Sequence, residues 1–232
     1  GMTVFEAAKN AGIDIPHYCY HPGLSIAGAC RMCLVEIEKM PKLQISCNTV
    51  VAEGMVVYTD TEEVREAVKG VLEFILINHP LDCPICDQAG ECGLQDYYMK
   101  YGLYKSRMVE PKVKKGKVIP LGPIGPVGRG IMLDQERCIL CARCVRFMKE
   151  IAKSEELAIF KRGNRVELNT FPGKGLQSPY SCNIVDICPV GALTSADFRF
   201  KCRAWFLSHT PSVCPGCANG CNVFIHHAKY QS

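Results

Sequence analysis

One short stretch of the chain, His79 to Cys92, gathers four side chains that can bind a soft metal centre. They are one imidazole and three thiols, at His79, Cys83, Cys86 and Cys92. The two-residue gap between Cys83 and Cys86 lets neighbouring thiolates bind the same centre, and soft thiolates select zinc or an iron–sulfur cluster. One histidine with three cysteines suits either centre, so this stretch alone leaves the metal open.

The whole chain holds 16 cysteines among 232 residues, far more than is usual for an intracellular protein. Most stand in Cys-x-x-Cys groups, where a disulfide would close a very small loop and stabilise little. Residues 1–30 lack the apolar core of a signal peptide. The longest nearly uncharged apolar run, Val71–Ile77, is too short to cross a bilayer. We therefore expect a reducing compartment and metal-bound cysteines.

Charge gives no sign of a nucleic-acid partner. The net charge is only +4, and the basic residues are spread out except for a run over 112–117. No aromatic residues interleave with that run, so it is interpreted as a solvated loop.

The first cysteine group has the spacing of a plant-type [2Fe–2S] centre with a stretched first gap. Its members are one distant cysteine, a Cys-x-x-Cys pair and a later fourth, at Cys19, Cys30, Cys33 and Cys47. A four-cysteine zinc site is the alternative. Apolar patterning predicts strands over Leu34–Ile37 and Gly54–Thr59 beside these ligands.

Two helices are predicted to position these groups. Thr3 and Glu6 form a capping-box pattern that starts a short helix over Val4–Ala11. Asp60 is expected to open a second helix, whose apolar residues recur at helical spacing and predict a buried face. Those residues are Val64, Ala67, Val68, Val71, Leu72 and Ile75. The second helix would deliver His79 to its cluster loop.

A third group, after a segment rich in Gly and Pro, has the spacing of a ferredoxin [4Fe–4S] site. It reads Cys-x-x-Cys-x-x-Cys, at Cys138, Cys141 and Cys144. Bacterial ferredoxins continue with a fourth cysteine and a proline, but here the corresponding position is Met148. The Cys-Pro pair appears instead at Cys188, which we expect to fold back and complete one [4Fe–4S] site.

The last group, Cys214, Cys217 and Cys221, offers three ligands without a fourth. Cys182 and Cys202 are unassigned and could supply one. We expect instead that the fourth ligand lies downstream of Ser232, outside this chain.

Several soft-metal groups in a row indicate one-electron transport rather than chemistry on an organic substrate. The chain shows no P-loop, no dinucleotide-binding glycine motif and no nucleophile elbow that would suggest such a substrate site. By chain order, the His79 group would be the middle stop of the electron path. A zinc-stabilised scaffold without a redox role is the alternative from a different class.

Four segments resemble the large iron–sulfur subunit (the G subunit) of bacterial respiratory NADH:quinone oxidoreductase (complex I). They are the runs 30–35, 79–92, 186–193 and 197–201. The resemblance implies a [2Fe–2S] cluster on the first four cysteines, a [4Fe–4S] cluster on His79 with its three cysteines, and another on the Cys138 group with Cys188. It also implies that the Cys214 group begins a region resembling molybdopterin oxidoreductases, with a further [4Fe–4S] cluster in some members.

The fold expected from this resemblance is α+β. It comprises a β-grasp ferredoxin-like domain over 1–60 that lacks its first hairpin, a helical His-Cys₃ segment over 61–104 and a linker over 105–131. A ferredoxin-like [4Fe–4S] domain over 132–204 and the start of the molybdopterin-oxidoreductase-like region over 205–232 follow.

The resemblance also implies a function, partners and a location. Electrons would arrive from NADH through a flavin-bearing subunit and leave through other iron–sulfur subunits towards quinone. The chain would lie in the peripheral arm of a membrane complex, on the cytoplasmic side of the inner (plasma) membrane. The nearest alternatives are the electron-input half of an iron-only hydrogenase, the diaphorase subunit of an NAD-reducing hydrogenase, and a formate dehydrogenase subunit.

Overall fold

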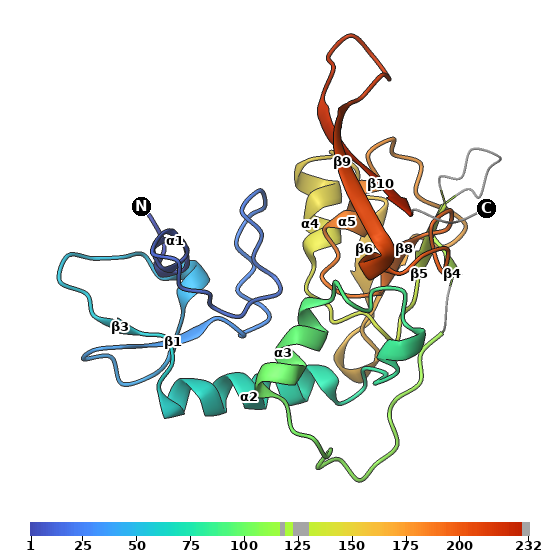
Figure 1. The fold of residues 1–232 in the computed structure, drawn as a ribbon. Coiled ribbons are helices and arrows are strands. Elements are labelled where there is room, and N and C mark those ends of the chain that lie inside the picture. The colour runs from blue at the N-terminus through green and yellow to red at the C-terminus, as the bar shows by residue number, and fades with distance from the viewer. Residues whose placement is uncertain (117–118, 123–129, 229–232) are drawn as a thin grey trace.

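Helix α2 (Glu62–Leu76) is the longest element, and it connects two bodies of mixed helix and strand (Figure 1). The computed structural model describes residues 1–116, 119–122 and 130–228. The body with α1 lies near one end of α2, and the body with α4 and α5 lies near the other. Within the described ranges, every helix is too short or too polar to cross a membrane.

The first body pairs a capped helix with a small sheet. In α1 (Val4–Asn10), the Glu6 carboxylate accepts a hydrogen bond from the Thr3 N–H at 2.8 Å, which confirms the capping box. Antiparallel strands run in the order β2-β1-β3, namely β2 (Gln44–Ile45), β1 (Leu34–Ile37) and β3 (Val57–Tyr58). The first predicted strand is confirmed, and the second is shorter than predicted.

Helix α2 begins one residue later than predicted. The hydroxyl of Thr61 accepts a hydrogen bond from the Val64 N–H at 3.3 Å and so caps the helix. Asp60 instead forms an ion pair with Arg65 at 2.7 Å. The predicted apolar face is confirmed, because Val64, Val68 and Leu72 are buried at 3% exposure or less.

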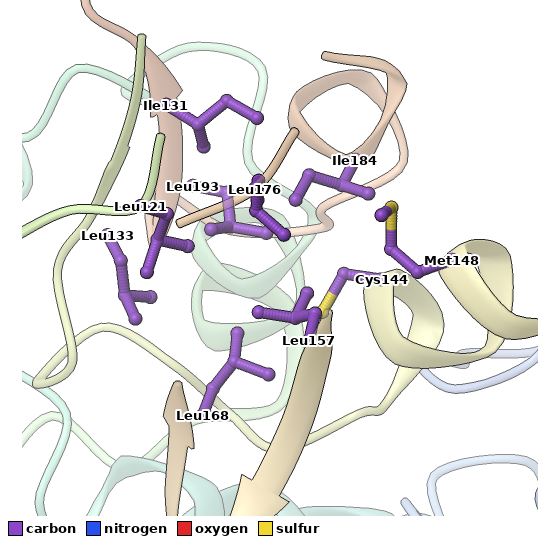
Figure 2. Close-up of a cluster of buried hydrophobic side chains, with 10 residues drawn as sticks. All are labelled: Leu121, Ile131, Leu133, Cys144, Met148, Leu157, Leu168, Leu176, Ile184 and Leu193. Atoms are coloured by element: carbon purple, nitrogen blue, oxygen red, sulfur yellow. The ribbon is translucent and has the colours of Figure 1, made fainter. Parts of the chain in front are cut away.

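The second body surrounds helix α4 (Arg143–Glu150). Its other elements are β4 (Ile119–Pro120), β5 (Ile131–Leu133), β6 (Leu157–Phe160), β7 (Glu167–Thr170), α5 (Asn183–Asp186) and β8 (Leu193–Ser195). Strands β4, β5 and β8 form one antiparallel sheet, and β6 pairs with β7. Figure 2 shows their core, in which Cys144 and Met148 of α4 pack with the leucines of the strands.

The segment 105–131, predicted as a linker, contributes strand β4 to this sheet. Leu121, which follows β4, is 1% exposed in the second core. The part of the Gly-Pro repeat at 123–129 lies outside the described residues.

Short elements complete the described chain. Helix α3 (Gly93–Tyr101) follows the second cysteine group, and single 3₁₀ turns cover η1 (Ser46–Asn48), η2 (Cys83–Ile85), η3 (Gly163–Arg165) and η4 (Ala204–Phe206). The last element is an antiparallel hairpin of β9 (Leu207–Val213) and β10 (Asn222–Ala228), which projects from the second body (Figure 1). Sequence analysis did not predict this hairpin.

We predict that Leu72→Ala destabilises the protein by about 2–5 kcal/mol, because Leu72 is 0% exposed and its removal leaves a cavity under α2. Urea unfolding of the anaerobically purified protein measures the effect. Phe74→Ala on the same helix is the control, since Phe74 is 77% exposed and its loss should cost less than about 0.5 kcal/mol. Equal effects of the two variants would contradict the burial of this face.

Candidate metal centres

The first cysteine group is assembled by pairing between β1 and β2. Leu34 pairs with Ile45, and the Ser46 N–H donates to the Cys33 carbonyl at 2.9 Å. This register places Cys33, which precedes β1, next to Cys47, which lies in η1. The loop that precedes the sheet brings the Cys30 N–H to within 3.5 Å of the Cys19 sulfur.

The four thiols of this group interact as two coupled pairs. The Cys30 thiol donates to the Cys19 sulfur and lowers the pKa of Cys19, and the pKa of Cys30 rises in return. Cys47 lowers the pKa of Cys33 in the same way, and its own pKa rises. Each pair therefore favours thiolate character on one sulfur, which is the state that binds iron.

The second group surrounds a cavity of about 130 Å³. Its walls include His79 and all three thiols, at Cys83, Cys86 and Cys92. The turn η2 carries Cys83, and the Cys86 N–H closes that turn on the Cys83 carbonyl at 3.1 Å. Cys92 directly precedes α3, whose first backbone N–H groups point towards its sulfur.

Within this group, His79 has a buried ring nitrogen that lacks a protein partner. Its Nδ1 atom is buried and has no hydrogen-bond partner among the described residues. Burial lowers the pKa of His79 to about 4, so the imidazole is neutral near pH 7. A neutral ring nitrogen without a protein partner can coordinate a metal, whereas leaving it unbound in the interior would cost free energy.

The donors of the second group surround a space rather than a single point. Among residues 1–116, 119–122 and 130–228, no three His, Cys, Asp or Glu side chains are placed to hold one metal ion. The four donors instead stand around a cavity. A cavity lined by four donors leaves room for a centre of several irons.

The third group brings Cys188 back to the Cys-x-x-Cys-x-x-Cys loop, as predicted from the Cys-Pro pair. Cys138, Cys141, Cys144 and Cys188 line one pocket together with apolar residues. Burial raises the pKa of Cys138, Cys141 and Cys188 to about 11 each and that of Cys144 well above its usual value. Binding of a metal centre in this pocket would therefore have to displace protons from these thiols.

The backbone of this loop is turned towards the sulfurs by two left-handed residues. Leu140 has φ 55° and Ala142 has φ 58°, conformations that cost a non-glycine residue roughly 1–2 kcal/mol each. The Leu140 N–H donates to the Cys138 sulfur, and the Arg143 N–H donates to the Cys141 sulfur. Amide donors aimed at sulfur stabilise negative charge on an iron–sulfur centre.

Arg137 connects the second and third groups. It precedes Cys138, while its partner Asp82 precedes Cys83. The guanidinium donates to both carboxylate oxygens of Asp82, at 2.6 and 2.9 Å, and to Asp134 at 3.0 Å. The segment after Cys188 also contacts the second group, since a Cβ built on Gly191 would lie 2.6 Å from the Cys86 sulfur.

Helix α4 connects the first and third groups. Arg143 donates to the Tyr20 carbonyl at 2.6 Å. Arg146 donates to the carbonyls of Ser25 and Cys19. The same Arg146 lies 3.4 Å from the Cys141 carbonyl, so one side chain spans ligand loops of both groups.

The contacts between the groups do not follow chain order, and the expectation that the His79 group is the middle stop stays a prediction. The third group contacts the first through α4 and contacts the second through Arg137 and Gly191. The third group thus contacts both of the others, and the first and second groups are also joined, through the ring contact of Tyr18 with Tyr97 at 5.5 Å. Chain order could not reveal this, because the contacts join residues 55 to 127 positions apart.

The fourth group lies at the tip of the β9–β10 hairpin. The Cys214 N–H donates to the Cys221 carbonyl at 2.8 Å, and the Asn219 side chain donates to the Cys221 sulfur at 2.8 Å. Cys217 and Cys221 are exposed.

The two unassigned cysteines belong to other parts of the fold. Cys182 is exposed at the start of α5. The thiol of Cys202 donates to the Arg203 carbonyl at 3.5 Å, and the side chain of Arg203 reaches the second group. Neither cysteine is placed at the hairpin tip.

Sequence analysis missed the residues that hold these loops together: Arg137, Arg143, Arg146, Gly191 and Arg203. Arginine beside a cysteine group is a weak signal on its own. The partners of these side chains are backbone carbonyls or a distant aspartate, and spacing along the chain does not predict such pairs.

Three family profiles match successive parts of the chain. Residues 1–62 match a "2Fe-2S iron-sulfur cluster binding domain", and residues 69–107 match an "NADH-ubiquinone oxidoreductase-G iron-sulfur binding region". Residues 128–194 match an "NADH-quinone oxidoreductase subunit 3, ferredoxin-like domain".

Named relatives agree with these matches. The chain is 49% identical over 225 residues to the G subunit of NADH-quinone oxidoreductase from Rickettsia conorii, covering 97% of this chain and 32% of the relative. It is also 49% identical to the mitochondrial NADH dehydrogenase [ubiquinone] iron-sulfur protein 1 of Solanum tuberosum, covering 97% and 30%. The chain thus spans about a third of the length of these relatives.

A solved structure, an NAD+-reducing [NiFe]-hydrogenase in its H2-reduced state, is similar with a TM-score of 0.75 and 31% identity. The match covers 87% of this chain and 84% of that one.

We predict that Gly191→Ala disturbs the second group, because the new Cβ would lie 2.6 Å from the Cys86 sulfur and 3.1 Å from Gln88. The expected result is loss of at least half of the EPR signal from a cluster at that group. Gly70→Ala in α2 is the matched control, since a Cβ there meets nothing within 4 Å. An unchanged spectrum for Gly191→Ala would refute the close approach.

Proposed function

The chain belongs to the G-subunit family of NADH-quinone oxidoreductase, and on this premise we propose that it passes electrons one at a time between iron–sulfur clusters. The electrons would come from NADH through a flavin in a partner subunit and continue towards quinone. Each cluster would supply a centre that accepts and releases a single electron. The protein would hold, shield and tune these centres.

Three ligand sets support the proposal. Cys19, Cys30, Cys33 and Cys47 would hold one [2Fe–2S] cluster. His79 with Cys83, Cys86 and Cys92 would hold a [4Fe–4S] cluster, and Cys138, Cys141, Cys144 and Cys188 would hold a second.

The observation that carries the proposal is that thiols of all three sets adjoin one buried core. Tyr18, Met32, Leu72 and Val190 form part of this core, which also contains Cys92. Cys30 of the first set and Cys138, Cys141 and Cys188 of the third set pack against it. Side chains rather than open solvent therefore lie between the sets, and electrons would pass from set to set through this core.

The fourth group would begin a molybdopterin-oxidoreductase-like region. With Cys214, Cys217 and Cys221 it would hold a further [4Fe–4S] cluster together with a ligand from outside this chain. Its exposed position at a hairpin tip suits a site that another part of the protein covers.

Assignment to the complex implies partners and a place in the cell. The chain would contact a flavin- and NADH-binding subunit on one side and quinone-side iron–sulfur subunits on the other. It would associate with the membrane through that complex, in the peripheral arm on the cytoplasmic side.

A hydrogenase role is the second candidate, because the similar solved structure belongs to an NAD+-reducing [NiFe]-hydrogenase. Its 31% identity is lower than the 49% identity to the G-subunit relative. Purification of the native complex from its host separates the two roles: NADH-dependent quinone reduction supports the first, and hydrogen-dependent NAD+ reduction supports the second.

We predict about ten irons and ten acid-labile sulfides per chain from three filled clusters, one [2Fe–2S] and two [4Fe–4S]. Anaerobic iron, sulfide and zinc analysis of the purified protein measures them. A filled fourth site in a longer protein would add about four of each. Stoichiometric zinc without labile sulfide would instead establish a zinc-stabilised scaffold and refute electron transfer.

We predict that His79→Cys keeps a cluster at the second site but lowers its reduction potential. A thiolate in place of a neutral imidazole adds one negative charge, and replacement in the opposite direction raises the potential of Rieske centres. EPR during a redox titration measures the midpoint of each cluster. Midpoints that all stay unmoved would show that His79 is not a ligand.

A further inference from the structure

Arg137 occupies an unusual position for a cation. Its residue exposure is 8%, and it forms part of the wall of the cavity that His79, Cys83, Cys86 and Cys92 surround. A guanidinium is always charged in a protein. The guanidinium therefore lies at the wall of the second site, whereas the carboxylates of Asp82 and Asp134 that balance its charge are not among the residues that line the cavity.

Two carboxylates fix this guanidinium in place. Asp82 accepts two hydrogen bonds and Asp134 accepts one, so three of the five N–H donors of Arg137 are used. The bidentate geometry restricts both the position and the plane of the group. Because Asp82 directly precedes Cys83, the same bonds hold the loop that carries the second ligand set.

The charge acts on the second site more directly than the neighbouring arginines do. Arg137 lines the same cavity as His79, Cys83, Cys86 and Cys92. Arg203 reaches the same loop, but its side chain donates to the carbonyls of Cys86 and Pro84, each at 2.5 Å. Arg203 is not part of the cavity wall.

We propose that Arg137 is a positioning residue for the cluster at His79, Cys83, Cys86 and Cys92, and that its fixed charge raises the reduction potential of that cluster. Reduction adds one negative charge to the cluster, and a cation at the wall stabilises the reduced state more than the oxidised state. This inference rests on the proposed electron-transfer function. It assigns to Arg137 a role that holding two loops together would not require.

The test compares charge with anchoring in the complete, cluster-loaded protein. In Arg137→Gln, both carboxylates remain and the guanidinium charge is lost. We expect the ratio of reduced to oxidised second cluster, at a fixed potential, to fall at least tenfold, which is 59 mV for a one-electron couple. Arg137→Lys keeps the charge but not the fork, and we expect it to retain most of the wild-type midpoint.

Asp82→Asn is a second, independent variant with an effect of opposite sign. It removes a negative charge beside the same site and leaves Arg137 bonded to Asp134, so the midpoint should rise. If Arg137→Gln does not fold, the midpoint of Asp82→Asn still shows whether charge at this position sets the potential of the second cluster. Arg203→Gln is the matched control and should shift the midpoint less than a third as far as Arg137→Gln.

Each outcome has a distinct meaning. Wild-type protein without clusters would refute the proposed function itself. Full iron and sulfide content in the variants with unmoved midpoints would overturn the inference about Arg137 alone. An equal shift in Arg203→Gln, or an equal shift in Arg137→Lys, would show that loop anchoring and not charge sets the potential.

Discussion

Arginine side chains from residues 137–203 hold the loops that carry the other two ligand sets. Arg137 binds Asp82 beside the second set, and Arg203 binds the carbonyls of Pro84 and Cys86. Arg143 and Arg146 bind carbonyls in the loop of the first set. These long-range donors satisfy backbone carbonyls of the loops and fix the shape of the loops. The relative placement of the three sets depends on this constraint.

The same loops combine burial with directed amide donors. Burial makes a thiolate costly, as the raised pKa values of the third set show. The left-handed residues Leu140 and Ala142 oppose that cost by turning amides towards sulfur. Under the proposed function, this backbone strain would be coupled to metal binding, because a bound centre would benefit from the amide donors that the strained loop provides. The neutral His79 reduces negative charge at the second set by a different route.

Local patterns are predictable from sequence, and long-range contacts are not. The capping box at Thr3 and the strand Leu34–Ile37 follow from adjacent residues alone, and both are confirmed. The start of α2 is predicted at Asp60 instead of Thr61 because both residue types can cap, and the choice depends on the pairing of Asp60 with Arg65. The β9–β10 hairpin escapes prediction because Pro211 and several polar residues interrupt the alternation that marks a strand.

The core beneath α2 has a consequence for how the chain could be divided. It takes Tyr18 and Met32 from the first predicted domain, Leu72 and Cys92 from the second, and Val190 from the ferredoxin-like part. A fragment cut at any of these boundaries would expose an apolar surface that the missing part normally covers. Along the chain the three ligand sets look like separate modules. In the folded protein they share one hydrophobic core. Moving one set into another scaffold would therefore also require the core residues that the other two segments contribute.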